Sequence, residues 1–233
     1  KQPPDLFKIS ENDNNKQDTR GQKLILNGYK RDNYQREMAQ QYLKKIDDDD
    51  WILINDIDEI PNLKNVDLHS FNSKLIFFKQ QIFFYKFNLH YPSTPWYGSR
   101  ACKKKKFISP QWLRDMKHKK YPLWRLDTIF SKKKYNNIYY VNNGGWHFTN
   151  IKTPENIHKK LLNYTHHDEF EKSGINLDDL KKKIKGKEAI YDHAVDQKTN
   201  KWNSKTILNK IELNKMPDYL KENYKKYTNW LEV

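Results

Sequence analysis

The sequence has a single cysteine and no long apolar run, and both absences narrow what the chain can be. Cys102 alone excludes an internal disulfide, so nothing indicates an oxidising compartment. No stretch of about 18 apolar residues is present, so no transmembrane helix is expected. The sequence also lacks a Walker loop, a Gly-x-Gly-x-x-Gly fingerprint, a Cys-x-x-Cys pair and a Gly-x-Ser-x-Gly elbow. Nucleotide binding by a P-loop or a Rossmann fingerprint is therefore unsupported.

Positive charge and aromatic side chains are what the chain has in excess. Its net charge of +15 attracts nucleotide diphosphates, nucleic acid or an anionic membrane surface, and charge alone does not choose among them. The 233 residues predict a single domain over residues 1–233, with an irregular N-terminal segment at 1–22 and a helical C-terminal extension at 190–233. Without a signal, an anchor or disulfides we expect a cytoplasmic protein, and the Golgi lumen stays open for a chain whose anchor lay upstream.

Hydrophobic periodicity predicts both helices and strands, and the apolar run at residues 51–54 predicts a buried strand in a sheet that is covered on both faces. Thr153, Pro154 and Glu155 read as a helix start, with an N-cap, a proline at the first helical position and an acid in the first turn. The expected helices cover residues 33–46, 62–72, 153–164 and 177–185 and a last one from 217; the expected strands cover 51–55, 75–90, 138–141 and 146–148, with an irregular middle around prolines 92, 95 and 110.

The most informative segment is the end of the predicted strand at residues 51–55. The apolar run gives way to Asp56, Ile57, Asp58 and Glu59, and Pro61 is expected to stop the strand. Alternation along a strand would place Asp56 and Asp58 on one side, at the carboxyl end of a central strand where open α/β sheets bind ligands. Carboxylate oxygens suit Mg²⁺ or Mn²⁺, with substrate phosphates completing the shell, while a solvated acidic turn is the plainer interpretation.

Further along the chain, two histidine-containing segments could supply metal binding and acid–base chemistry. His147 follows two glycines and Trp146, and with the two aspartates it would make a plausible divalent-metal set. His166 and His167 precede Asp168 and Glu169, so imidazole and carboxylate lie together as a general base requires. A polar helix end whose histidines favour the C-terminal dipole explains the same residues.

With these residues in view, the chain resembles the family 17 glycosyltransferases, the β-1,4-mannosyl-glycoprotein 4-β-N-acetylglucosaminyltransferase family. Residues 31–36 are similar to the family's Arg-Glu-x-x-Gln-Arg stretch, and residues 54–61 to its Asp-x-Asp-Glu-Ile-Pro signature. Residues 145–148 resemble its Gly-Trp-His segment, and residues 153–157 follow at the family's distance. The resemblance covers about residues 1–190. A β-α-β segment that usually precedes the stretch matched by residues 1–8 is absent, which predicts a fragment or a donor pocket completed differently.

The resemblance implies an α/β, GT-A-like fold in which helices flank a mixed sheet. It also implies an inverting, metal-dependent transfer of N-acetylglucosamine from UDP-N-acetylglucosamine onto a glycan hydroxyl. Its partners would be a nucleotide-sugar donor and a glycan or glycoconjugate acceptor, and its cofactor Mn²⁺ or Mg²⁺. It implies metal or diphosphate contacts at Asp56, Asp58 and His147, donor binding by Arg31, Arg36, Trp146 and Lys160, and a catalytic base at Glu169 or Asp168.

Three other functions are compatible with the same residues. A basic module could bind polyanions through its lysines and interleaved aromatic rings without catalysis, although the resemblance disfavours a nucleic-acid partner. A metal-dependent phosphoesterase could use Asp56 and Asp58 without a sugar acceptor. A transferase fold that has lost activity could still bind sugar.

Overall fold

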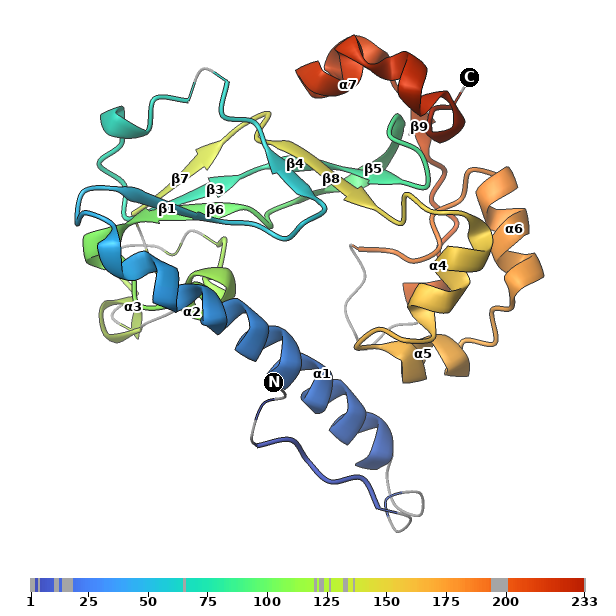
Figure 1. Cartoon of the computed structure of the whole chain (residues 1–233), viewed down its shortest axis with the longest axis horizontal. Helices are drawn as coiled ribbons and strands as arrows, with labels where there is room; N and C mark the ends of the chain where they lie inside the picture. Colours follow the sequence, from blue (N-terminus) through green and yellow to red (C-terminus); the bar gives the residue numbers. More distant parts are fainter. Residues whose placement is uncertain are drawn as a thin grey trace.

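Two β-sheets that follow one another along the molecule form its centre (Figure 1). The structure is a computed structural model that describes residues 3, 5–10, 13, 19–64, 66–119, 121, 124, 125, 127–131, 134, 135, 137–193 and 201–232. Within these residues, a four-stranded sheet has the order β1-β6-β3-β7 and a five-stranded sheet the order β2-β8-β4-β5-β9. The strands are β1 (Trp51–Ile54), β2 (Glu59–Pro61), β3 (Leu75–Phe78), β4 (Gln80–Phe84), β5 (Leu89–Trp96), β6 (Arg100–Lys103), β7 (Ile138–Val141), β8 (Gly145–Thr149) and β9 (Asn209–Lys210).

Both sheets are mixed, and they are joined at their middle strands. β3 pairs in parallel with β7, and β4 pairs in parallel with β8, whereas the other strand pairs are antiparallel. Only Lys79 separates β3 from β4, and its backbone bonds both Val141 and Gly144. β1 lies outside β6 whereas β2 lies outside β8, so residues 55–58 lead the chain from the edge of one sheet to the opposite edge of the next.

Helices and turns cover both faces of the sheets, so the chain is a mixed α/β domain, as predicted. Trp112 and Leu113 of α2 pack on Ile52, Phe77 and Cys102 of the four-stranded sheet. Helices α4, α5 and α6 cover one face of the five-stranded sheet, and α7 covers the other (Figure 1). The helices are α1 (Thr19–Glu37), α2 (Pro110–Asp115), α3 (Asp127–Phe130), α4 (Pro154–Leu161), α5 (His167–Lys172), α6 (Leu177–Lys185) and α7 (Asp218–Glu222), with 3₁₀ helices at Met38–Lys45, Leu68–Ser70, Lys104–Lys106, Lys201–Asn203, Leu213–Lys215 and Tyr224–Trp230.

Several predicted elements are confirmed because their signals are local. Strands β1, β7 and β8 lie where the apolar runs placed them, and α6 has the predicted bounds. Helix α4 begins after Thr153, whose hydroxyl accepts a hydrogen bond from the Asn156 amide at 3.4 Å. An N-cap, a proline and an acidic first turn lie within four residues of one another, so no distant contact is needed to predict that start.

The prediction for residues 1–46 placed the helix wrongly. Helix α1 begins at Thr19, inside the segment expected to be irregular, and ends at Glu37, and residues 38–45 continue as a 3₁₀ helix. The helix is polar overall, so its first half carries no apolar periodicity to reveal it. Long-range polar contacts support it instead: the Asn27 side chain accepts from the Phe7 amide at 2.7 Å and donates to the Phe7 carbonyl at 2.8 Å.

Five further predictions need correction. Strand β1 lies at a sheet edge rather than in the centre, and Pro61 belongs to β2 rather than stopping a strand. Strand β5 includes Pro92 and Pro95, which were expected to mark irregular structure; prolines are compatible with strands where no ladder donor is needed. The helix predicted at 62–72 is reduced to the 3₁₀ turn Leu68–Ser70, and the C-terminal segment contains strand β9 besides its helical turns.

Cys102 lies fully buried in β6, and burial raises the pKa of its thiol to about 12. None of the helices in the described part of the chain is both long and apolar enough to cross a membrane.

Candidate functional site

The acidic residues after β1 form a tight turn rather than the end of a strand. The Glu59 amide donates to the Asp56 carbonyl at 3.0 Å, and the Asp56 amide donates to the Glu59 carboxylate at 3.1 Å. Ile57, at the tip of the turn, is fully exposed. The prediction that Asp56 and Asp58 share one side of a strand is therefore wrong. The two side chains face different partners on the two sides of the turn.

Glu59 is a buried carboxylate that joins the turn to the strands beneath it. Its side chain has no exposed surface. It accepts from the Trp96 indole at 2.7 Å, from the Arg114 guanidinium at 3.0 Å and from the Ser99 hydroxyl at 3.3 Å. A Cβ atom on Gly98 would lie 1.8 Å from the nearer Glu59 oxygen, so only glycine leaves room for this carboxylate.

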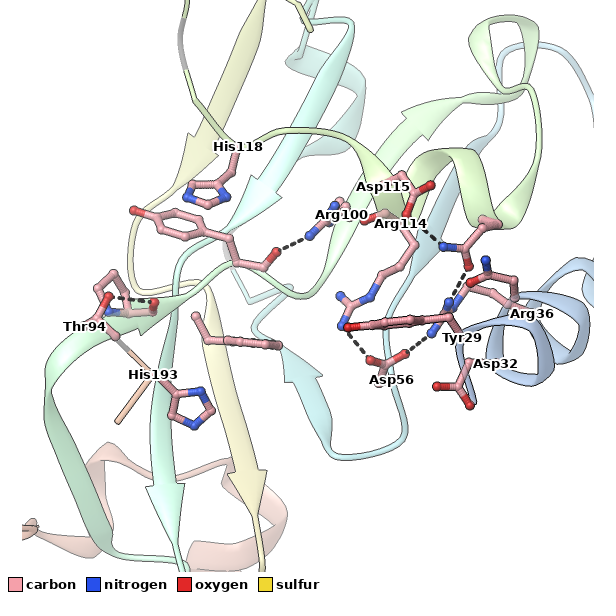
Figure 2. Close-up of a pocket in the computed structure, with 15 residues that line it drawn as sticks. Tyr29, Asp32, Arg36, Asp56, Thr94, Arg100, Arg114, Asp115, His118 and His193 are labelled. Carbon is pink, nitrogen blue, oxygen red and sulfur yellow. Dashed lines mark hydrogen bonds and ion pairs between the residues drawn. The ribbon is translucent and has the colours of Figure 1, made fainter. Parts of the chain in front are cut away.

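Asp56 lies between two guanidinium groups. Arg114 of α2 donates to one of its oxygens at 2.5 Å, and Arg36 of α1 lies 3.2 Å from the other (Figure 2). Arg36 also donates to the side chain of Gln111. Of the predicted donor-binding residues, Arg36 thus lies beside the acidic turn, whereas Arg31 is exposed on α1 and is not among the described residues that line the adjoining cavity.

A cavity of about 760 Å³ opens beside Asp56, between α1, α2 and the end of β5 (Figure 2). Three arginines and three aspartates make its charge nearly balanced, and aromatic rings supply flat apolar surface. Arg100 donates to the backbone carbonyls of Tyr97, Gly98 and Met116 at 2.8–3.1 Å, and burial together with Arg114 lowers its pKa to about 10. The lining residues are Tyr29, Asp32, Asn33, Arg36, Asp56, Thr94, Pro95, Trp96, Tyr97, Arg100, Gln111, Arg114, Asp115, His118 and His193.

Asp58 faces a second set of predicted residues, His147 and Lys160. The His147 Nε2 atom lies 3.6 Å from an Asp58 oxygen, and the His147 ring stacks on Trp96 with centroids 4.7 Å apart. Burial alone would raise the pKa of Asp58, but His147 and Lys160 outweigh it and lower that pKa below its ordinary value. Burial likewise lowers the pKa of Lys160, although Asp58 opposes this shift. Trp96 both lines the 760 Å³ cavity and contacts His147. The residues around Asp58 are therefore neighbours of the cavity.

The fit of a divalent metal to these residues is partial. Asp58 and His147 face each other and offer one oxygen and one nitrogen ligand, and the buried Nδ1 of His147 has no hydrogen-bond partner among the described residues. Asp56 is directed at two guanidinium groups instead. Among the described residues, no cluster of three or more His, Cys, Asp and Glu has the spacing of a metal site. Any bound ion would therefore need ligand oxygens from its substrate.

Lys160 also borders a cavity of about 520 Å³ that is lined entirely by amides and ammonium groups. The Lys160 ammonium donates to the Asn150 side chain at 2.9 Å. Lys152 contributes to lowering the Lys160 pKa, as expected for neighbouring cations. No carboxylate is among the described residues that line this cavity, so its field is positive. The lining residues are Lys152, Asn156, Lys159, Lys160 and Asn163.

The remaining predicted residues lie away from the acidic turn. Trp146 alternates with His147 along β8, donates its indole N–H to the Lys215 carbonyl at 2.8 Å and lines a separate cavity near α7. Asp168 pairs with Lys172 at 2.7 Å within α5. Glu169 accepts from Lys201 at 2.5 Å and contacts His166 at 2.8 Å. Neither acid is among the described residues that line the 760 Å³ cavity.

Sequence reasoning missed the residues that hold the acidic turn in place. Arg114 stands 58 positions after Asp56 in a segment read as irregular, and no local pattern marks it. Trp96 and His193 were likewise not selected. Glu59 had a signal, since a third acid in one turn is costly unless it is paired.

No family model matches the chain, and no curated protein or solved structure is significantly similar to it.

Proposed function

We propose that this protein is a metal-dependent inverting glycosyltransferase with a GT-A-like fold, and that it transfers a sugar from a nucleotide-sugar donor to a glycan hydroxyl. The observation that carries the proposal is the turn at residues 56–59, which directs neighbouring carboxylates into two different polar environments. Asp56 faces a roomy, charge-balanced cavity, whereas Asp58 faces an imidazole and an ammonium group. Such a transfer needs two adjoining places of these two kinds, one for hydroxyl-rich sugar and one for phosphate.

The 760 Å³ cavity suits a sugar residue. Sugars are uncharged, present apolar ring faces and carry many hydroxyl groups. Trp96 and Tyr97 offer flat surfaces, and Asp56, Asp115 and Arg114 offer acceptors and donors in fixed positions. The balanced charge of the walls disfavours a ligand of high net charge.

The side of Lys160 suits phosphate. The cavity that Lys160 shares with Lys152 and Lys159 has ammonium groups and neutral amides on its described walls, and ammonium groups bind phosphate oxygens as point charges. Lys160 lies close enough to Asp58 for each to shift the pKa of the other. A diphosphate near Lys160 could therefore reach the Asp58 carboxylate as well.

Asp58 and His147 would hold the Mn²⁺ or Mg²⁺ ion that the proposal requires. When bound, such an ion acts as a Lewis acid that neutralises charge on a departing diphosphate. Trp96 stacks on His147 and fixes the orientation of its ring. Asp56 holds Arg36 and Arg114 at the cavity wall, which is a positioning role. The donor implied by the resemblance is UDP-N-acetylglucosamine.

Thermal unfolding against UDP, UDP-N-acetylglucosamine and other nucleotide sugars, with and without Mn²⁺, tests the proposal. We expect one of them to raise the melting temperature only when Mn²⁺ is present. The shift should disappear in Asp58→Asn and shrink in Lys160→Gln, while Lys172→Gln, remote from the turn, should keep it. Absence of any shift with every nucleotide and metal would overturn the proposal.

A polyanion-binding module is the second candidate, favoured by the carboxylate-free lysine cavity and the net charge of +15. It predicts metal-independent binding of oligonucleotides that weakens steeply as salt rises. Fluorescence anisotropy with a labelled oligonucleotide, repeated at several salt concentrations, distinguishes the two functions.

A further inference from the structure

Helix α1 packs against the segment that precedes α5 with unusual closeness. A Cβ atom on Gly28 would lie 2.6 Å from the Thr165 side chain, so the missing side chain lets the two segments touch. The contact brings the next residue, Tyr29, to His166, and their rings meet edge to face at 5.8 Å. Tyr29 is also one of the residues that enter the 760 Å³ cavity from α1 (Figure 2).

A chain of polar contacts continues from Tyr29 away from the cavity. The Tyr29 hydroxyl lies 3.2 Å from His166 Nε2, and His166 Nδ1 lies 2.8 Å from a Glu169 oxygen. The other Glu169 oxygen accepts from the Lys201 ammonium at 2.5 Å. Hydroxyl, imidazole and carboxylate thus stand in the order that activates a hydroxyl group in general-base catalysis.

We propose that Tyr29, His166 and Glu169 form a proton relay that takes the proton from the hydroxyl group of a ligand bound in the 760 Å³ cavity. This inference rests on the proposed function and supplies it with a base. Glu169, one of the two acids expected as the base, then acts through His166 and Tyr29 rather than by direct contact with the ligand.

The transfer is balanced at each atom. The ligand O–H bond breaks, and its proton passes to the Tyr29 oxygen while the Tyr29 proton passes to His166 Nε2. The proton on His166 Nδ1 stays there and remains hydrogen-bonded to the Glu169 carboxylate. The products are therefore an imidazolium and an ionised carboxylate. The ligand oxygen forms a bond to the donor sugar carbon, and the bond from that carbon to the diphosphate breaks.

The surrounding charges suit these protonation states. Burial, Glu169 and Asp32 raise the pKa of Tyr29, so its hydroxyl stays protonated at neutral pH and can pass a proton on. Burial would raise the pKa of Glu169, but Lys201 and His166 outweigh it, so Glu169 stays ionised. A carboxylate at Nδ1 fixes the imidazole tautomer with a free lone pair on Nε2. Tyr29 on α1, Tyr164 before α5 and Glu169 on α5 contact the His166 ring. Two charged groups lie one contact further away: Asp32 beside Thr165 and Lys201 beside Glu169.

The test combines a readout of His166 itself with kinetics of the full chain. ¹⁵N NMR of the histidine rings should show the His166 Nε2 signal shifting in Tyr29→Phe and not in Tyr34→Phe. Tyr34 is a matched control because it lies on α1 but is not among the described residues that line the cavity. Glu169→Gln should change the tautomer of the same ring.

Transfer rates give the second readout. We expect Tyr29→Phe and Glu169→Gln to lower kcat about 100-fold with little change in donor KM, and to displace the acid limb of the pH–rate profile. A Tyr29→Phe protein with the kcat and pH profile of the unchanged chain would overturn the relay alone. If the unsubstituted protein gains no stability from any nucleotide sugar, the proposed function and the relay are overturned together. Melting temperatures of each variant show whether a loss of rate reflects unfolding.

Discussion

Asp56 and Asp58 stand two residues apart, and their carboxylates are equally exposed, at 36%. Asp56 nevertheless contacts two guanidinium groups, at 2.5 and 3.2 Å, whereas Asp58 has one imidazole at 3.6 Å. The same residue type in one turn is thus used in two ways. Asp56 organises the cations of the cavity wall, whereas Asp58 keeps lone pairs that a ligand or metal ion can use. An Asp-x-Asp pattern therefore need not mean two equivalent metal ligands.

Replacing Glu59 should have the largest effect on the difference between Asp56 and Asp58, because the turn would lose the buried carboxylate that holds it in place. Glu59→Ala removes the buried carboxylate that Arg114 and Trp96 share, and removing one member of a buried ion pair costs about 3–5 kcal/mol. Denaturant unfolding measures the loss. Glu59→Gln, which keeps the volume, should lose less; equal losses would show that the charge does not matter.

Gly98→Ala should be the next most damaging change. Its Cβ would lie 1.8 Å from Glu59 and 2.2 Å from the Trp96 indole, and overpacking of this kind costs about 1–3 kcal/mol. Combined with Glu59→Ala, the second loss should be smaller than in the unchanged chain, because the clashing carboxylate is gone. Unfolding of the two single variants and the double variant completes the cycle. Strict additivity would contradict the close contact.

The aspartates themselves should differ in kind. Asp56→Asn should cost about 1 kcal/mol of stability after allowance for solvent screening, because two guanidinium groups lose their charged partner. Asp58→Asn should alter stability less but abolish the metal-dependent response to nucleotide sugars. Thermal unfolding with and without Mn²⁺ separates the two effects. If both variants lost the same stability and the same metal-dependent response, Asp56 and Asp58 would not have different roles.

Low pH should reduce the difference in stability between the unsubstituted protein and the Asp58→Asn variant. The lowered pKa of Asp58 means that its ionised form stabilises the fold above the ordinary aspartate pKa, and that this contribution is lost as pH falls through the lowered value. The stability gap between the unchanged chain and Asp58→Asn should therefore narrow below about pH 4. Melting temperatures from pH 7 down to pH 3 measure it, and a gap that widened on acidification would reverse the assigned sign.

The smallest effect on stability is expected at Ile57, between the two aspartates. Its side chain is fully exposed, so Ile57→Ser should change the unfolding free energy by less than about 0.5 kcal/mol. Under the proposed function, a sugar that extended over the tip of the turn would touch this exposed apolar side chain. A weakened nucleotide-sugar response at unchanged stability would show that contact, and an unchanged response would show that the ligand lies entirely below the turn.

The sequence predicted those features whose signals lie close together in the chain. The N-cap of α4, the apolar runs of β7 and β8 and the acidic turn after β1 each occupy a few residues. The partners of that turn lie far from it in the sequence. Arg114 comes from α2, and Trp96 comes from the end of β5, a strand that was not predicted because it contains two prolines. The polar helix α1, which supplies Tyr29 and Arg36, has too weak an apolar pattern to be placed correctly. Pairing across long sequence separations accounts for both failures.

The burial of Cys102 makes the chain a convenient background for spectroscopic labels. The sequence contains no other cysteine, and this thiol is shielded in β6 with its pKa raised to about 12. Thiol reagents should therefore leave the native protein untouched at neutral pH. Two cysteines introduced on the exposed faces of α1 and α6 would then carry a dye pair or two spin labels without removal of a native residue. Movements of α1 on addition of a ligand could then be followed directly in solution.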